Sequence, residues 1–178
     1  MNTTASLSTL KILLERDLFL RVLIRELSGI LEDVVGYDEA AGYISLVGQR
    51  IGVWLNELYK KELGVSSLSA GQVAEVLVDL KSRILGEFSI ACCDDQKIVL
   101  DNRTCPFEDK VVDRPSMCMM TSNVFGVIAA ENLGYAKVVL EKTIAKRDGM
   151  CRVVVYLAPS PESESAQGRE YFRSGNTL

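Results

Sequence analysis

Apolar residues recur every three or four positions through the first half of the chain, which is the spacing of one face of an α-helix. The pattern predicts helices over residues 7–35, 38–63 and 69–82, the third with Ser69 as its N-cap. The first helix carries apolar residues on more than one face. Because so wide an apolar surface must be buried on more than one side, we expect this helix to pack on its own domain and on a second copy of the chain. Burial inside a monomer is the alternative.

The second predicted helix contains three interior glycines, Gly42, Gly48 and Gly52. Each interior glycine lowers the stability of a helix by about 1 kcal/mol relative to alanine. A gain elsewhere must therefore offset them. Close approach of a neighbouring helix is the favoured explanation, and space for a ligand is the alternative.

After residue 83 the period of the pattern shortens towards two, which is typical of β-strands. A further helix is predicted to begin at Pro115 and to end before Gly134. Since hairpins place consecutive strands antiparallel, we predict an α+β fold, with the helices on one face of an antiparallel sheet. The predicted strands form two hairpins, 84–92 with 97–102 and 135–145 with 151–157.

This pattern divides the chain into three parts. Residues 1–35 form a predicted dimerisation helix, and residues 36–157 form the main, ligand-binding domain. Residues 158–178 are rich in proline, serine and glutamate and poor in apolar residues, so we expect a mobile tail. Tyr171 and Phe172 are the only residues there that offer an anchor.

Charge and composition exclude several classes of function. The net charge is −4, and no dense Lys/Arg run is present, which argues against direct binding of nucleic acid. No apolar run reaches the length of a membrane span, and the first residues lack the layout of a signal peptide, so we expect a cytoplasmic protein. The chain has no histidine, so the commonest metal ligand and general base is missing.

Three of the five cysteines, Cys105, Cys118 and Cys151, fall on a predicted loop, a predicted helix start and a predicted strand start. Together with Glu108, Asp109 or water, three thiolates suit a zinc site, and they also suit an iron–sulfur cluster. Two alternatives remain open. The thiols either pack as small apolar side chains or sense the redox state.

Cys118 lies in the first turn of the helix that begins at Pro115. The helix dipole is expected to lower the pKa of a thiol at that position, which makes a cysteine-dependent enzyme a third hypothesis. Since the chain offers no histidine as a base for the thiol, we favour a non-enzymatic function.

The same helix is also predicted to form one wall of a cavity for a small hydrophobic molecule. Its small residues leave room, its methionines and phenylalanine give an adaptable apolar surface, and an arginine and a cysteine supply the polar groups that orient a ligand. Core packing of these residues is the alternative. The predicted ligand-binding residues are Arg114, Met117, Cys118, Met120, Phe125, Gly126 and Ala129.

Four blocks carry a resemblance to a known family. They are VGQRIG at 47–52, QVAEVLVDLK at 72–81, NRTCPFEDKV at 102–111 and PSMCMMTSNVFGVIAAENLGYAKV at 115–138. These blocks resemble methanogen output domain 1, a relative of the vinyl-reductase-like small-molecule-binding domains, and the resemblance runs from about the second helix to Leu157.

The resemblance implies a fold similar to that of transport-particle and haem-based nitric-oxide-sensor ligand-binding domains, in which helices pack on a twisted antiparallel sheet. It also implies a homodimer and a sensory or regulatory role, with an unidentified ligand and an unidentified signalling partner. Two positions depart from the pattern of the vinyl-reductase-like relatives. Thr143 stands where they often have a cysteine, and Arg147 replaces the glycine of a turn, which argues against a four-cysteine cluster.

Overall fold

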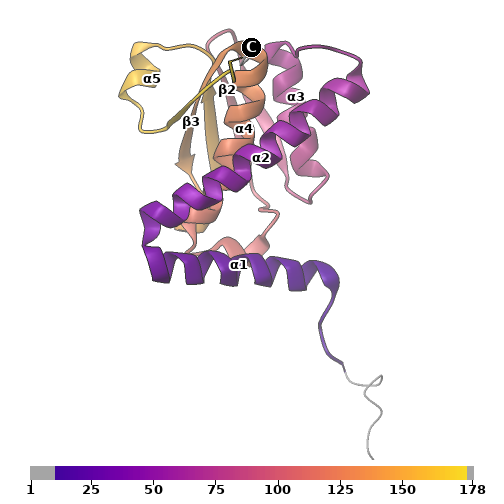
Figure 1. Cartoon of the computed structure of the whole chain (residues 1–178), viewed down its shortest axis with the longest axis vertical. Coiled ribbons are helices and arrows are strands. Elements are labelled where there is room, and N and C mark those ends of the chain that lie inside the picture. Colours follow the sequence, from indigo (N-terminus) through magenta and orange to yellow (C-terminus); the bar gives the residue numbers. More distant parts are fainter. Residues whose placement is uncertain (1–10, 176–178) are drawn as a thin grey trace, which may run out of the picture.

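The computed structural model describes residues 11–175, which form an α+β domain with one antiparallel sheet (Figure 1). The predicted fold class is therefore confirmed. The helices are α1 (Arg16–Val35), α2 (Tyr37–Leu63), α3 (Ala70–Ser82), α4 (Cys118–Leu133) and the short α5 (Pro161–Ser165). The strands are β1 (Phe88–Cys93), β2 (Lys97–Asn102), β3 (Tyr135–Lys142), β4 (Cys151–Tyr156) and β5 (Arg169–Phe172). Their order in the sheet is β1-β2-β4-β3-β5.

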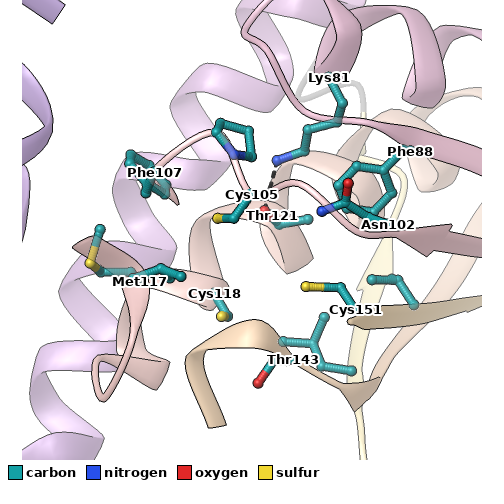
Figure 2. Close-up of a pocket in the computed structure, with 14 residues that line it drawn as sticks. Lys81, Phe88, Asn102, Cys105, Phe107, Met117, Cys118, Thr121, Thr143 and Cys151 are labelled. Carbon is teal, nitrogen blue, oxygen red and sulfur yellow. Dashed lines mark hydrogen bonds between the residues drawn. The ribbon is translucent and has the colours of Figure 1, made fainter. Parts of the chain in front are cut away.

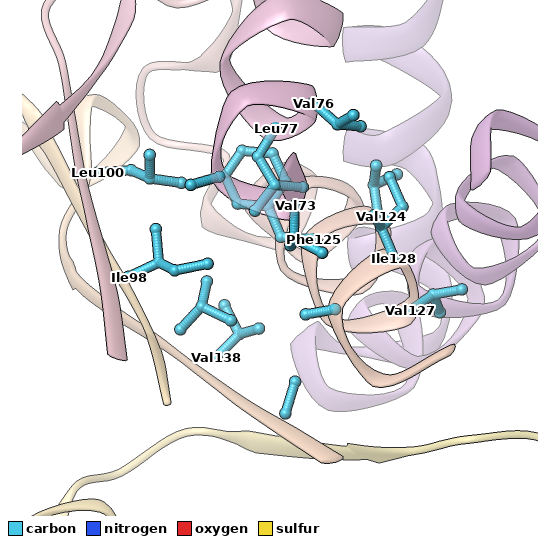
Figure 3. Close-up of a cluster of buried hydrophobic side chains, with 14 of the residues drawn as sticks. Val73, Val76, Leu77, Ile98, Leu100, Val124, Phe125, Val127, Ile128 and Val138 are labelled. Carbon is cyan, nitrogen blue, oxygen red and sulfur yellow. The ribbon is translucent and has the colours of Figure 1, made fainter. Parts of the chain in front are cut away.

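Helix α4 is the centre of the fold, between the sheet and α2 (Figure 1). The helix has no polar face, since residues on all its sides are buried. A helix that is apolar all round is stable only when other elements enclose it. The sheet and α3 cover one side of α4, and α2 crosses the other (Figure 3).

The main hydrophobic core lies where α3, α4 and the sheet meet (Figure 3). Phe125 of α4 is fully buried there and packs edge-on against Phe88 of β1, with ring centroids 5.5 Å apart. Edge-to-face aromatic pairs contribute about 0.5–1.5 kcal/mol beyond the area that they bury. The buried members include Val73, Leu77, Ile98, Leu100, Val124, Ile128, Val138 and Val155.

Two of the three glycines of α2 let this helix approach α4 closely. A Cβ added at Gly48 would lie 2.8 Å from Cβ of Asn123, and one at Gly52 would lie 3.0 Å from Cβ of Val127. Of the two explanations for these glycines, close helix packing is the one that the structure supports. A Cβ added at Gly42 would meet open space, so close packing does not explain the glycine at this position.

Helix α1 begins at Arg16, whereas the pattern predicted a start at residue 7. Residues 11–15 are not helical, and residues 7–10 of the prediction lie outside the described part of the chain. Leu13 is 91 % exposed and Leu14 is 68 % exposed, so no neighbouring element packs on residues 11–15. Apolar spacing alone does not stabilise a helical turn that packs on nothing.

The side of α1 that packs on the domain is largely polar, with Ile24 as an apolar contact to the buried cluster around Met117. The side that packs on the domain carries Arg21 and Ser28, which are buried, and the partly buried Arg25 and Glu32. By the 3.6-residue pitch, the large apolar side chains gather on the opposite side. They are Phe19, Leu20, Leu23, Leu27, Ile30 and Val34, which are 40–75 % exposed.

The segment expected to be a mobile tail instead completes the fold up to residue 172. Helix α5 and strand β5 follow β4, and β5 pairs antiparallel with β3. Tyr171 holds the strand in place, because its ring is buried against Gly126 and its hydroxyl lies 2.9 Å from Oγ of Ser122. The mobile-tail prediction is therefore wrong for α5 and β5, although Tyr171 is one of the two anchors that the sequence offered.

Candidate functional site

A small cavity lies at the end of the sheet where β2 ends and where β1 and β4 begin (Figure 2). Cross-strand pairing sets its floor, since Asn102 is paired with Phe88 on one side and with Cys151 on the other. The volume open to the centres of water molecules is about 30 Å³, which is room for about two water molecules. The lining residues are Lys81, Phe88, Asn102, Cys105, Pro106, Phe107, Val111, Met117, Cys118, Thr121, Leu140, Thr143, Cys151 and Val153.

Lys81 is the charged side chain of this cavity, and it is 6 % exposed. It lies at the end of α3, four residues after the buried Leu77 and therefore on the same face of the helix. Its ammonium Nζ donates a hydrogen bond to Oγ1 of Thr121 at 2.8 Å (Figure 2). The same Nζ lies 5.6 Å from the ring centroid of Phe88 and 5.4 Å from that of Phe125, within the range of cation–π attraction.

Burial lowers the pKa of Lys81 to about 8, although the thiols of Cys105, Cys118 and Cys151 act in the opposite direction. Removal from water disfavours the charged form of an amine, and a neighbouring hydroxyl and two aromatic rings replace only part of the lost hydration. At neutral pH the cavity therefore contains an ammonium group that is close to losing its proton.

We expect Lys81 to make the stability of the protein rise with pH between about 7.5 and 9. The pKa of Lys81 is about 8 in the folded protein, against an ordinary value of 10.5, so the unfolded chain binds more protons over this range. Stability therefore rises with pH, by about 1 kcal/mol for this group. Urea titrations compare the wild type with Lys81→Met, whose side chain has a similar volume but no charge. The free energy of unfolding of the variant minus that of the wild type should fall by about 1 kcal/mol between these pH values, and a constant difference contradicts the expectation.

The three cysteines singled out by the sequence, Cys105, Cys118 and Cys151, all line this cavity (Figure 2). They come from the loop after β2, from the first residue of α4 and from the first residue of β4. Sγ of Cys151 accepts a hydrogen bond from N of Ile144 at 3.4 Å. Among residues 11–175, however, no group of three His, Cys, Asp or Glu side chains has the arrangement that holds a metal ion. The zinc and iron–sulfur hypotheses therefore gain no support from the geometry.

The pKa of Cys118 is shifted in the direction opposite to the one that the helix dipole predicted. Burial, together with the neighbouring Cys151 and Cys105 thiols, raises this pKa to about 12. Burial also raises the pKa of Cys105. Desolvation outweighs the dipole because a dipole at a helix terminus contributes only about 0.3–1 kcal/mol. Cys118 is therefore a protonated thiol at neutral pH, which is a poor nucleophile.

Only two of the predicted ligand-binding residues, Met117 and Cys118, line the cavity. Met120 faces a separate groove between α1 and α2, and Arg114 contacts Gly29 of α1. The remaining three lie in the packed core, since Gly126 contacts the ring of Tyr171 and both Phe125 and Ala129 are fully buried. The small residues of α4 therefore let β5 and the sheet pack closely, and they leave no room for a ligand.

Sequence reasoning missed Lys81, Phe88 and Asn102. The sequence did contain a signal for Lys81. Val73, Leu77 and Lys81 follow one another at intervals of four residues, so Lys81 lies on the buried apolar face of α3. Phe88 and Asn102 meet only through the register of β1 and β2. That register is not visible in the spacing of residues along the chain.

The loop between β2 and α4, residues 103–114, covers the cavity and is called the cavity loop below. Helix α1 holds this loop with two arginines. Arg21 forms an ion pair with Glu108, and Arg25 donates hydrogen bonds to the carbonyls of Lys110 at 2.6 Å and Val112 at 2.8 Å. The arginines of α1 thus hold the cavity loop at residues that neighbour the lining residues Phe107 and Val111.

A family model for methanogen output domain 1 matches residues 23–156. This match covers most of the chain, so the chain belongs to that family, as its sequence blocks indicated. Among proteins with curated descriptions, none matches the chain. Within the described residues, no helix has the length and apolar content needed to cross a membrane.

Two solved structures share the fold. One is the phenol-responsive sensory domain of the transcription activator PoxR with phenol, at 14 % identity and a TM-score of 0.63 over 86 % of this chain and 80 % of that one. The other is a trafficking protein particle complex subunit 3 from Naegleria fowleri covalently bound to palmitic acid. It matches at 13 % identity and a TM-score of 0.53, over 88 % of this chain and 99 % of that one.

Proposed function

We propose that this domain is a non-enzymatic sensor that binds a small molecule with an apolar body in the cavity beside Lys81. The observation that carries the proposal is the cavity itself, which combines apolar walls with a few polar side chains, namely those of Lys81, Asn102, Thr121 and Thr143. Ligand sites of proteins have this composition. The family and the likeness to a sensory domain support a sensory or regulatory role.

The two structural neighbours support the choice of ligand class. The PoxR domain responds to phenol, and the trafficking subunit is bound to palmitic acid. Both molecules have an apolar body with one polar end. The cavity here is smaller than the roughly 150 Å³ that holds a benzene ring in an engineered protein, so an aromatic ligand requires the lining to move. Met117 and Phe107 are suited to this movement, because one is flexible and the other lies on the cavity loop.

Two observations disfavour catalysis and redox sensing by the cysteines. The chain contains no histidine, and burial raises the pKa of both Cys105 and Cys118. The thiolate is the reactive form of cysteine in both kinds of chemistry. We therefore assign these thiols to the apolar lining of the cavity.

The domain is proposed to act as a homodimer through the outer face of α1. This face presents six large apolar side chains to solvent, while the inner face of the same helix is largely polar, with Ile24 as an apolar contact. Such a contiguous apolar surface is typical of an interface. A second copy of the same helix offers a matching apolar surface, since a twofold interface is self-complementary.

Helix α1 also provides a route from the cavity to the proposed dimer interface. Its arginines hold the cavity loop, and its opposite side forms the apolar face. A ligand that displaces the cavity loop changes these contacts and therefore the position of α1. In this proposal, an unidentified signalling partner responds to the change in the dimer.

A binding experiment with three neutral probes tests the cavity. Phenol, benzamide and isobutyramide are titrated into the wild type and into Cys118→Leu, whose larger side chain fills the cavity. Cys92→Leu is the control, because Cys92 is exposed and lies outside the cavity lining. At least one probe should bind the wild type and the control with equal affinity. The same probe should bind Cys118→Leu more weakly, by about tenfold or more. If neither these probes nor benzoate and isobutyrate bind the wild type, or if both variants behave alike, the proposal is wrong.

A further inference from the structure

Lys81 is a buried cation without a counter-ion. Its ammonium group has three N–H donors, and within residues 11–175 its one hydrogen-bond acceptor is Oγ1 of Thr121. No carboxylate of the described residues forms an ion pair with it. Buried charges in proteins are normally paired, since an isolated charge away from water is costly.

A second donor faces the same cavity. The side chain of Asn102 is 2 % exposed, and its Oδ1 accepts a hydrogen bond from N of Thr104 at 3.2 Å. This bond fixes the orientation of the amide and leaves its Nδ2 as a donor beside the ring of Phe88 (Figure 2). The cavity thus offers N–H donors from two sides, whereas its walls are apolar.

From this arrangement we infer that the ligand is a weak acid with a small apolar body, bound as the anion, whose oxygen atoms accept hydrogen bonds from Lys81 and Asn102. This inference rests on the proposed function and adds the chemical class of the ligand. A carboxylate or phenolate supplies the missing counter-ion, and a charge-assisted hydrogen bond is about twice as strong as a neutral one. The apolar body contacts Met117, Leu140 and Val153.

Proton uptake provides a signature of this binding mode. The titratable groups that act on Lys81 among the described residues are the thiols of Cys105, Cys118 and Cys151. Since the pKa of free Lys81 is about 8, about half of the molecules carry the charge at pH 8. An anion beside the amine favours its charged form, so binding of an acid at pH 8 should take up about half a proton per site. A neutral ligand should take up none.

Matched pairs of probes test the inference. Benzoate is compared with benzamide, and isobutyrate with isobutyramide, by calorimetric titration at pH 7 in the wild type. Each acid should bind about tenfold more tightly than its amide. At pH 8, repeating the titrations in buffers of different ionisation enthalpy should give the uptake of about half a proton for the acids alone.

Two variants assign the effect to Lys81. Lys81→Met should weaken the binding of the acids by about tenfold or more and leave the binding of the amides within about threefold. Thr121→Val removes the acceptor of Lys81 and keeps its charge, so the preference for acids and the proton uptake should remain. Circular dichroism confirms that each variant is folded, and proton uptake by the wild type tests the inference even if Lys81→Met does not fold.

The possible failures are distinguishable. If the amides bind, and Cys118→Leu blocks them, but the acids bind no better and no proton is taken up, the proposed cavity stands and the acidic ligand is wrong. The same conclusion follows if Lys81→Met leaves the affinity for acids unchanged. If neither acids nor amides bind the wild type, both the proposed function and this inference are overturned.

Discussion

Replacing Leu20 and Leu27 with glutamate is expected to convert the proposed dimer into a monomer. Both side chains belong to the apolar outer face of α1, where they are 46 % and 59 % exposed in the single chain. In a dimer they would be buried against the second copy, and four introduced carboxylates would then lose their hydration without gaining a partner. The dissociation constant should rise by about 100-fold or more, as measured by analytical ultracentrifugation over a range of concentrations.

Two controls accompany this variant. Replacing the same two leucines with methionine keeps an apolar face, so the dimer should persist. Placing glutamate at Ile84 and Ile90, which are 51 % and 41 % exposed and lie outside α1, adds the same charge without touching the apolar outer face. Loss of the dimer in this second control would indicate an effect of charge alone. A dimer of normal stability with glutamate at positions 20 and 27 would place the interface elsewhere.

The spacing of apolar residues predicted the α+β class and most of the elements, because the helices of this chain are long and their caps are marked in the sequence. Ser69 forms a capping box with Gln72, and Gly64 ends α2 in the left-handed conformation. The sequence could not predict which side of α4 packs on the sheet and which side packs on α2. A helix that is apolar on every side has no polar face, so periodicity does not say which residues contact which neighbour.

The predicted site failed where its chemistry depends on burial. The three cysteines do meet in one cavity, but the pairing of β2 with β4 that brings Cys151 beside Asn102 joins strands that are not consecutive. A sequence position at a helix start indicates the effect of the dipole on Cys118 and does not indicate how much water the thiol loses. In this protein the loss of water determines the direction of the pKa shift.

Strand β5 was missed for a related reason. Its four residues have too little apolar content to predict a strand on their own. The strand is stable because β3 offers a free edge and because Gly126 leaves space for the ring of Tyr171. Both partners lie far away in the sequence, so no local signal records them.

The contact between Gly126 and Tyr171 gives the second prediction with a large effect. A Cβ at position 126 would lie 2.1 Å from Cδ2 and 2.3 Å from Cε2 of the tyrosine ring, so Gly126→Ala must displace the ring and with it β5. We expect the free energy of unfolding, measured by urea denaturation, to fall by about 1–3 kcal/mol, which is the usual range for overpacking. Helix propensity alone would make the same substitution stabilising.

Gly42→Ala is the matched control, because Gly42 also lies inside a helix but has no atom within 4 Å of its Cβ position. This variant should gain about 0.5–1 kcal/mol from helix propensity. Combining Gly126→Ala with Tyr171→Ala tests the contact itself. Once the ring is removed, the added methyl group meets no obstacle, so the double variant should be more stable than the sum of the two single effects by about 1 kcal/mol or more. If Gly126→Ala is as stable as Gly42→Ala, the ring of Tyr171 does not occupy the space that the glycine leaves, and β5 must be held by its pairing with β3 alone.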